Sequence, residues 1–201
     1  MIRVLLAEDQ TMVRGALASL LDLEPDIEVV AQVSRGDEVV AAAIASKPDV
    51  ALLDIEMPGR TGLDAADELA GVLPGCRILI LTTFGRPGYL RRAMEGGAAG
   101  FLLKDAPAGE LASAIRRAVA GERVVDPGLA AAALSQGESP LTPREDEVLR
   151  ASRDHATVAD LAQALYLSPG TVRNHLSSAM HKLDARNRAE AVRIAEERGW
   201  L

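Results

Sequence analysis

Residues 140–149 read Pro-Leu-Thr-Pro-Arg-Glu-Asp-Glu-Val-Leu, and residues 157–176 read Thr-Val-Ala-Asp-Leu-Ala-Gln-Ala-Leu-Tyr-Leu-Ser-Pro-Gly-Thr-Val-Arg-Asn-His-Leu. The first stretch predicts the start of a helix. Thr142 can cap this helix, Pro143 fits its first turn, and Glu145 completes a capping box with Thr142.

The second stretch predicts two more helices with a tight turn between them. Thr157 with Asp160 gives a weaker capping box, and Ser168 followed by Pro169 starts the next helix only three residues after Leu165. Two short helices joined by a tight turn, with a polar second helix, have the geometry that fits a DNA major groove.

The C-terminal pattern extends to four predicted helices, at about 143–152, 157–165, 169–183 and 188–198, with Gly199 as the final stop. The segments Leu-Thr-Pro-Arg-Glu, Ala-Xaa-Xaa-Leu and Ser-Xaa-Xaa-Thr-Val-Arg-Asn-His resemble the LuxR-type helix-turn-helix over about the last 60 residues. This region also looks like that of DesR-type members of the family. The final helix pairs the DNA-binding domains in that family, whereas packing within its own domain is the alternative.

Composition limits the class of protein. With 201 residues and 48% hydrophobic content the chain can bury one substantial core or two small ones, built from aliphatic residues because aromatics are only 2%. A single cysteine, Cys76, excludes an internal disulfide and suits a reducing compartment. No apolar stretch reaches membrane-spanning length. We therefore expect a soluble, cytoplasmic protein without a membrane partner.

The net charge of −7 argues at first against a nucleic-acid ligand. Residues 138–201 are close to neutral, with 9 Lys/Arg and 10 Asp/Glu, and the positive charge within 156–188 is modest. Because phosphate neutralisation supplies most non-specific affinity, a single copy should bind DNA weakly.

Residues 1–121 alternate apolar runs with helical periodicities. The runs suit strands buried on both faces of a parallel sheet, and they fall at 4–7, 29–33, 50–53, 78–81 and 101–103. Five strand–helix units predict an α/β doubly wound domain with a five-stranded parallel, flavodoxin-like sheet. We predict this domain at 1–121, a linker at 122–139 with a short helix near 129–134, and a small all-α domain at 140–201.

Polar residues follow four of the five predicted strands, and the ends of parallel strands meet at one edge of the sheet. They are Glu8, Asp9, Asp54, Thr82, Thr83 and Lys104. Taken singly, Asp9 is explained by a helix cap and Asp54 by the turn that follows it. Together, the converging carboxylates predict a Mg²⁺ site with Asp54 as a nucleophile toward phosphoryl groups. Lys104 would balance the new charge, and Thr82 would hydrogen-bond a phosphoryl oxygen.

The segment Asp54-Ile55-Glu56-Met57-Pro58-Gly59 resembles the phosphorylation site of bacterial receiver domains, with Thr82 28 residues later and Lys104 a further 22. The resemblance implies that Glu8 and Asp9 bind Mg²⁺, that Asp54 is phosphorylated, and that the carbonyl of Glu56 is a metal ligand. It also implies that Thr82 and Phe101 form a switch pair. Glu8 stands where Asp is also common, and its longer side chain allows a contact through water. With the C-terminal pattern, the chain is identified as a NarL/FixJ-type response regulator.

The helix at 169–183 should carry the DNA-reading face. Val172, Leu176, Ala179, Met180 and Leu183 form the predicted inward stripe, which leaves Asn174, Ser177, Ser178 and His181 outward with Arg173 beside them. Arg and Asn can read bases, whereas Thr171, Lys182, Arg186 and Arg188 are better placed for phosphates. The predicted DNA contacts are Thr171, Arg173, Asn174, Ser177, Lys182, Arg186 and Arg188.

The leading hypothesis is a two-component transcriptional regulator: a histidine kinase phosphorylates Asp54, the protein dimerises, and paired helices bind promoter DNA, with RNA polymerase as a further partner. Beyond weak hydrolysis of its own phosphoryl group, we expect no enzyme activity. A phosphohydrolase is the enzymatic alternative. A nucleotide-binding domain fused to a DNA-recognition domain is another alternative. The sequence argues against it, because the first predicted strand is followed by Glu-Asp-Gln and not by a Gly-rich phosphate loop. A regulator that uses the first domain only as a dimer scaffold is the remaining alternative.

Overall fold

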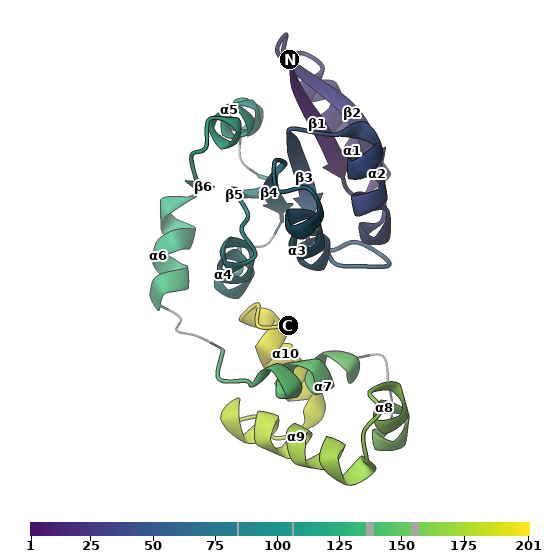
Figure 1. Ribbon diagram of the computed structural model, residues 1–201. Helices are drawn as coiled ribbons and strands as arrows, with labels where there is room; N and C mark the ends of the chain where they lie inside the picture. Colours follow the sequence, from purple (N-terminus) through teal and green to yellow (C-terminus); the bar gives the residue numbers. More distant parts are fainter. Residues whose placement is uncertain (84, 106, 136–138, 154–156) are drawn as a thin grey trace. The chain divides into compact units, whose positions relative to one another are not determined.

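The computed structural model describes residues 1–83, 85–105, 107–135, 139–153 and 157–201, and they form two compact units (Figure 1). The N-terminal unit comprises Met1–Gly85 and Tyr89–Ala132. The C-terminal unit comprises Arg86–Gly88 and Ala133–Leu201. None of the helices in these residues is long and apolar enough to cross a membrane.

A parallel sheet is the centre of the N-terminal unit, with the strand order β2-β1-β3-β4-β5-β6. The strands are β1 (Ile2–Ala7), β2 (Ile27–Val33), β3 (Val50–Asp54), β4 (Arg77–Thr82), β5 (Gly100–Leu103) and β6 (Val124–Val125). The doubly wound α/β fold and the first five strands are confirmed. The predicted strand count is wrong, because the segment interpreted as a linker contributes β6, which pairs with Gly100 and Phe101 of β5.

Helices cover both faces of this sheet, which explains the uninterrupted apolar runs of the strands. They are α1 (Thr11–Leu21), α2 (Val39–Ser46), α3 (Gly62–Val72), α4 (Pro87–Glu95) and α5 (Ala108–Val119), with a 3₁₀ turn at Gly36–Glu38. On one face, α1 and α5 pack on Val4, Leu6 and Leu52 through residues such as Leu21 and Ile115. Alternate strand residues such as Leu5, Leu53 and Ile80 are also fully buried.

The C-terminal unit contains the four predicted helices, each within about one residue of its expected ends. They are α7 (Pro143–Ala151), α8 (Val158–Ala164), α9 (Pro169–Lys182) and α10 (Arg188–Glu197). Helix α6 (Pro127–Ser135), the predicted linker helix, precedes them. Both capping boxes form, at Thr142 with Glu145 and at Thr157 with Asp160, and Ser168 caps α9.

The core of the C-terminal unit is built from the inward stripe of α9. Val172, Leu176 and Ala179 pack with residues of α7, α8 and α10. Ala191 and Ala195 of α10 are fully buried in the same core. The final helix therefore packs within its own unit through these residues, as the alternative interpretation predicted.

Gly62, the first residue of α3, holds the chain close to the end of β3. A Cβ atom at this position would lie 1.8 Å from the carbonyl oxygen of Asp54. The amide of Gly62 also donates a hydrogen bond to the carbonyl of Ile55, at 2.9 Å. Only glycine permits this close approach, because it has no Cβ atom. The position of the loop after Asp54 therefore depends on glycine at position 62.

We expect Gly62→Ala to destabilise the N-terminal unit by about 1–3 kcal/mol, the usual cost of forcing atoms into a packed site. Gly71→Ala is the matched control on the same helix, because a Cβ there meets nothing within 4 Å. It should stabilise the helix by about 0.5–1 kcal/mol. Urea unfolding followed by circular dichroism checks both changes. A Gly62→Ala protein as stable as the wild type would contradict the close approach.

Candidate functional site

Three carboxylates meet at the carboxyl edge of the sheet. Glu8 and Asp9 follow β1, and Asp54 ends the adjacent strand β3. Each offers a ligand oxygen, and these oxygens all lie within 4.8 Å of one another. Glu8 and Asp54 are buried, whereas Asp9 is exposed. The predicted convergence of these three residues is therefore present in the structure.

Lys104, directly after β5, completes the cluster. Its Nζ atom lies 2.6 Å from Oε2 of Glu8 and 2.9 Å from Oδ2 of Asp54. Its backbone amide donates to the carbonyl of Thr82 at 2.9 Å, which ties the end of β5 to the end of β4. Thr82 itself is buried. The predicted residues from four strands thus share one edge of the sheet.

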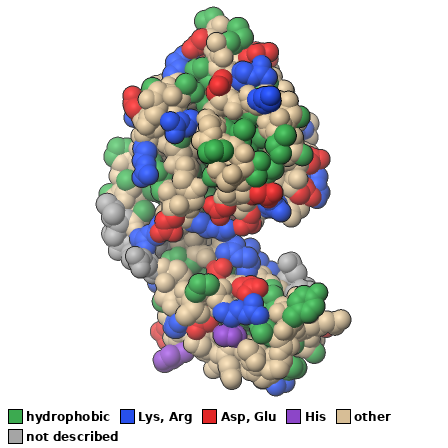
Figure 2. All heavy atoms as spheres, in the orientation of Figure 1, with side chains coloured by type: hydrophobic (Ala, Val, Ile, Leu, Met, Phe, Trp, Pro, Cys, Tyr) green, Lys and Arg blue, Asp and Glu red, His purple; other side chains and the backbone are tan. Residues whose placement is uncertain are grey.

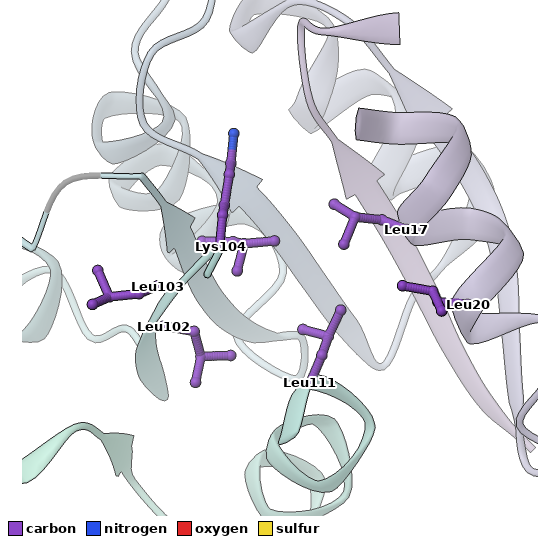
Figure 3. Close-up of a pocket in the computed structure, with 7 residues that line it drawn as sticks. Leu17, Leu20, Leu102, Leu103, Lys104 and Leu111 are labelled. Carbon is purple, nitrogen blue, oxygen red and sulfur yellow. The ribbon is translucent and has the colours of Figure 1, made fainter. Parts of the chain in front are cut away.

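Lys104 is one of the residues that line a largely apolar cavity of about 100 Å³ (Figure 3). Leu17 and Leu20 of α1, Leu111 of α5 and leucines of β4 and β5 line this cavity. In Figure 3 the aliphatic stem of Lys104 rises from the leucines and its ammonium points away from them. Apolar walls cannot satisfy an ammonium group, so the leucines favour its pairing with the carboxylates.

The carboxylates carry more charge than Lys104 neutralises. Burial raises the pKa of Asp54, and the ion pair with Lys104 opposes that rise only in part. Burial also raises the pKa of Glu8, and the nearby charge of Asp54 adds to the effect. Burial works against the charge of Lys104, but its hydrogen bonds to Glu8 and Asp54 raise its pKa. A further cation would relieve the crowding.

The donor set fits Mg²⁺. Carboxylate oxygens are the ligands this ion prefers, and a partly exposed cluster leaves room for the waters it retains. Oε2 of Glu8 is buried and lies 2.6 Å from the ammonium of Lys104. The oxygens of Glu8, Asp9 and Asp54 that lie within 4.8 Å of one another are the ones that could hold the ion. The Glu56 carbonyl as a ligand stays a prediction; its side chain is exposed.

The predicted switch residues occupy neighbouring strands. Thr82 ends β4, and Phe101 lies in β5 opposite Ile80. Phe101 is completely buried, and Thr82 is 2% exposed. Their places in the fold suit a signal that starts at Asp54 and passes through β4 and β5. The switching role itself stays a prediction.

Most of the predicted DNA-contact face lies on the outer side of α9. Arg173, Asn174 and Ser177 are exposed, and Thr171 is half-buried. Arg173 makes no hydrogen bond or ion pair with any residue that the structure describes. His175 is half-buried, as expected for a residue turned partly toward the core.

Ser178 departs from the predicted face. It was expected to point outward, but it is half-buried and its hydroxyl donates to Oε1 of Glu145 at 2.6 Å. Lys182, predicted as a phosphate contact, also has a partner within the unit: its Nζ donates to Oε2 of Glu145 at 2.6 Å. Arg186 forms an ion pair with Glu190. Arg188 is half-buried. Phosphate contacts by these cations stay predictions.

Sequence reasoning identified Glu145 only as part of a capping box and did not find its burial. Burial alone would raise the pKa of Glu145, but hydrogen bonds from Lys182, Ser178 and Thr142 lower this pKa to about 2. Tyr166 was also missed. It is 96% exposed in the turn between α8 and α9 and adopts a left-handed backbone conformation, with φ of 53°.

Comparison with known proteins agrees with both halves of this description. Residues 4–116 match the family of response regulator receiver domains, and residues 139–195 match the luxR family of bacterial regulatory proteins. The chain is a response regulator of the LuxR family. The predicted receiver domain and LuxR-type helix-turn-helix are therefore confirmed.

Relatives match this response regulator from end to end. It is 50% identical over 203 residues to the uncharacterized transcriptional regulatory protein YvfU and 48% identical over 201 residues to the transcriptional regulatory protein DesR. Both come from Bacillus subtilis (strain 168), and all of each chain is covered. The crystal structure of the response regulator ChrA, from a heme-sensing two-component system, is also similar, and the match covers 100% of this chain and 98% of the ChrA chain. Its identity is 36% and its TM-score is 0.58.

The low pKa of Glu145 predicts acid sensitivity of the C-terminal unit. A carboxyl group whose pKa is lowered by folding stabilises the native state above its unfolded value, near 4.5, and loses that contribution as the pH falls toward about 2. Glu145→Gln should therefore flatten the loss of stability between about pH 4.5 and 2. Fluorescence of Trp200, the single tryptophan, reports on the C-terminal unit during unfolding.

The control is Glu147→Gln, which alters an exposed carboxylate on the same helix. Its acid transition should match that of the wild type. Glu190, whose pKa is also lowered to about 2, contributes to the loss of stability over the same pH range in every variant. The contribution of Glu145 is therefore measured as the difference between the variants. Identical acid profiles for Glu145→Gln and the wild type would refute the assigned role of these hydrogen bonds.

Proposed function

We propose that a sensor histidine kinase phosphorylates this response regulator on Asp54 in a Mg²⁺-dependent reaction. The phosphorylated protein then dimerises and binds promoter DNA through α9. The cluster of Glu8, Asp9 and Asp54, two of which pair with Lys104, is the observation that carries this proposal. The protein works in the cytoplasm, where promoter DNA is found.

The chemistry follows from the residues around Asp54. A carboxylate oxygen of Asp54 attacks the phosphorus atom while the bond from phosphorus to the kinase histidine breaks, and the imidazole keeps the electron pair. Oδ1 of Asp54 is oriented by the amide of Ile55 at 2.8 Å. Mg²⁺ held by Glu8, Asp9, Asp54 and the carbonyl of Glu56 would neutralise charge on the transferred group.

Lys104 and Thr82 act on the product of this transfer. Lys104 already lies 2.9 Å from Oδ2 of Asp54, so its ammonium can remain beside the acyl phosphate and offset its charge. The hydroxyl of Thr82 binds a phosphoryl oxygen, which draws the end of β4 toward Asp54. Phe101 on the adjacent strand shifts together with Thr82, and the population of a second conformation, which has a dimerising surface, increases. Hydrolysis of the acyl phosphate by the same site is weak.

The first test of this proposal is covalent. Treatment with a small phosphodonor and Mg²⁺ should add one phosphoryl group to the wild type, measured by intact mass. Asp54→Ala should take up none, and chelation of Mg²⁺ should abolish the addition. Asp22→Ala, which alters an exposed acid at the end of α1, should be labelled normally. Full labelling of Asp54→Ala would overturn the proposal.

The second test concerns the switch. Phosphorylation should raise the dimer fraction in sedimentation, because a local contact acts by shifting a two-state equilibrium. Thr82→Ala should accept the phosphoryl group but show a smaller rise in dimer fraction. Thr83→Ala, at the adjacent exposed position, is the control and should dimerise as the wild type does. Normal dimerisation of phosphorylated Thr82→Ala would refute the coupling.

The third test concerns DNA. Arg173→Ala or Asn174→Ala should relax base preference at one position of each half-site and cost about 1–3 kcal/mol there. The half-sites should lie about 10 base pairs apart, on one face of the duplex. Selection from a randomised DNA library, with phosphorylated wild type and Arg173→Ala in parallel, measures the change. The same consensus sequence from both proteins would mean that α9 is not the reading helix.

A further inference from the structure

Glu145 joins the start of α7 to the later turns of α9 through hydrogen bonds to both oxygens of its carboxylate. Oε1 accepts from the hydroxyl of Ser178 at 2.6 Å. Oε2 accepts from the ammonium of Lys182 at 2.6 Å and from the amide of Thr142 at 2.7 Å. Glu145 is only 5% exposed, so these contacts replace water around a full charge.

A capping box does not require this burial. The second box of the same unit, Thr157 with Asp160, makes the same reciprocal contacts, yet Asp160 is exposed. Glu145 differs because α9 covers it and supplies two further donors. Burial of a charged side chain is costly unless it is paired and hydrogen-bonded. The arrangement therefore does more than cap α7.

The contacts from α9 define the rotation of this helix about its axis. Ser178 and Lys182 are four residues apart, so they lie on the same face and bracket one carboxylate. Apolar packing of Val172 and Leu176 is not directional, whereas hydrogen bonds have narrow angular limits. A rigid helix fixed at these two positions also fixes the direction in which Arg173 points.

The same geometry gives Lys182 a different role from the one predicted for it. Its charge is matched by a carboxylate that is almost fully buried. If Lys182 moved to a DNA phosphate, that carboxylate would remain buried without its cation, which is strongly unfavourable. Arg186 differs, because its side chain is 87% exposed and such pairs are weak enough to exchange for a phosphate.

We propose that Glu145 is a positioning residue for DNA reading: it sets the orientation of α9 through Ser178 and Lys182, and Lys182 is its structural counter-charge rather than a phosphate contact. The inference rests on the proposed function, in which α9 reads promoter DNA. Base discrimination then depends on Glu145, a residue that lies outside the reading face.

The experiment measures binding of the phosphorylated full-length protein to its selected DNA site and to a scrambled duplex, by fluorescence anisotropy. Glu145→Gln keeps the size of the side chain and loses the charge. It should weaken specific binding about tenfold, the effect of one charge-assisted hydrogen bond, and reduce the ratio of specific to non-specific affinity. Glu147→Gln is the matched control and should change neither value. Trp200 fluorescence confirms that each variant is folded at the assay temperature.

Salt dependence separates the two roles of Lys182. Lys182→Gln should weaken specific binding but leave the slope of log affinity against log salt unchanged. A phosphate contact would instead lower the magnitude of that slope by about 0.9 for each helix bound. Ser178→Ala removes an uncharged donor to the same carboxylate, so it should reduce discrimination even if the charge variants do not fold.

The outcomes distinguish this inference from the proposed function. If the phosphorylated wild type shows no preference for any DNA sequence, the proposed function fails and the inference fails with it. If the wild type discriminates and folded Glu145→Gln or Ser178→Ala discriminates equally well, only the inference is overturned. A slope reduced by about 0.9 in Lys182→Gln would return Lys182 to the phosphate contacts.

Discussion

The receiver site depends on one ammonium group that pairs with two of its three carboxylates. Lys104 contacts Glu8 and Asp54 at the same time, and it is the cation that holds these two buried acids at one edge of the sheet. Burial raises the pKa values of Glu8 and Asp54, the nearby negative charges add to this rise, and the single positive charge of Lys104 opposes it only in part. The remaining negative charge favours a divalent cation, and in the proposed function that cation would offset the repulsion between the carboxylates and an incoming phosphoryl group.

The fold supplies this arrangement through strand order. Parallel strands β1 and β3 are neighbours, so Glu8 and Asp54 leave the sheet side by side, while Lys104 reaches them from β5 across β4. Gly62 then holds the loop after Asp54 against the strand end. Elements that are far apart in the sequence therefore bring a few oxygen and nitrogen atoms within a few ångströms of one another, at the edge of a sheet that is buried on both faces.

The features that the sequence predicted are those carried by local periodicity and by helix caps. Apolar runs located five strands, and caps such as Thr142 and Ser168 located the helix starts. Strand β6 was missed because two residues are too short to form a run. The role of Glu145 was missed because its capping signature is the same as that of exposed Asp160. Burial depends on which helix covers the side chain, and a helical wheel assigns Ser178 a direction but not a partner.

Charge pairing in the C-terminal unit explains why phosphorylation and dimerisation should matter for DNA binding. Acidic and basic side chains are interspersed over the visible face of this unit (Figure 2). Arg150, Arg186 and Arg193 each form an ion pair with a carboxylate four residues away in the sequence, and Lys182 pairs with the buried carboxylate of Glu145. Exposed pairs of this kind are weak, so a phosphate can compete for an arginine, but each exchange gives up part of the gain. A single unit thus has little net electrostatic attraction for DNA. Under the proposed function, joining two units would make the second binding event intramolecular and multiply two weak affinities, so control of the dimer fraction would become control of DNA occupancy.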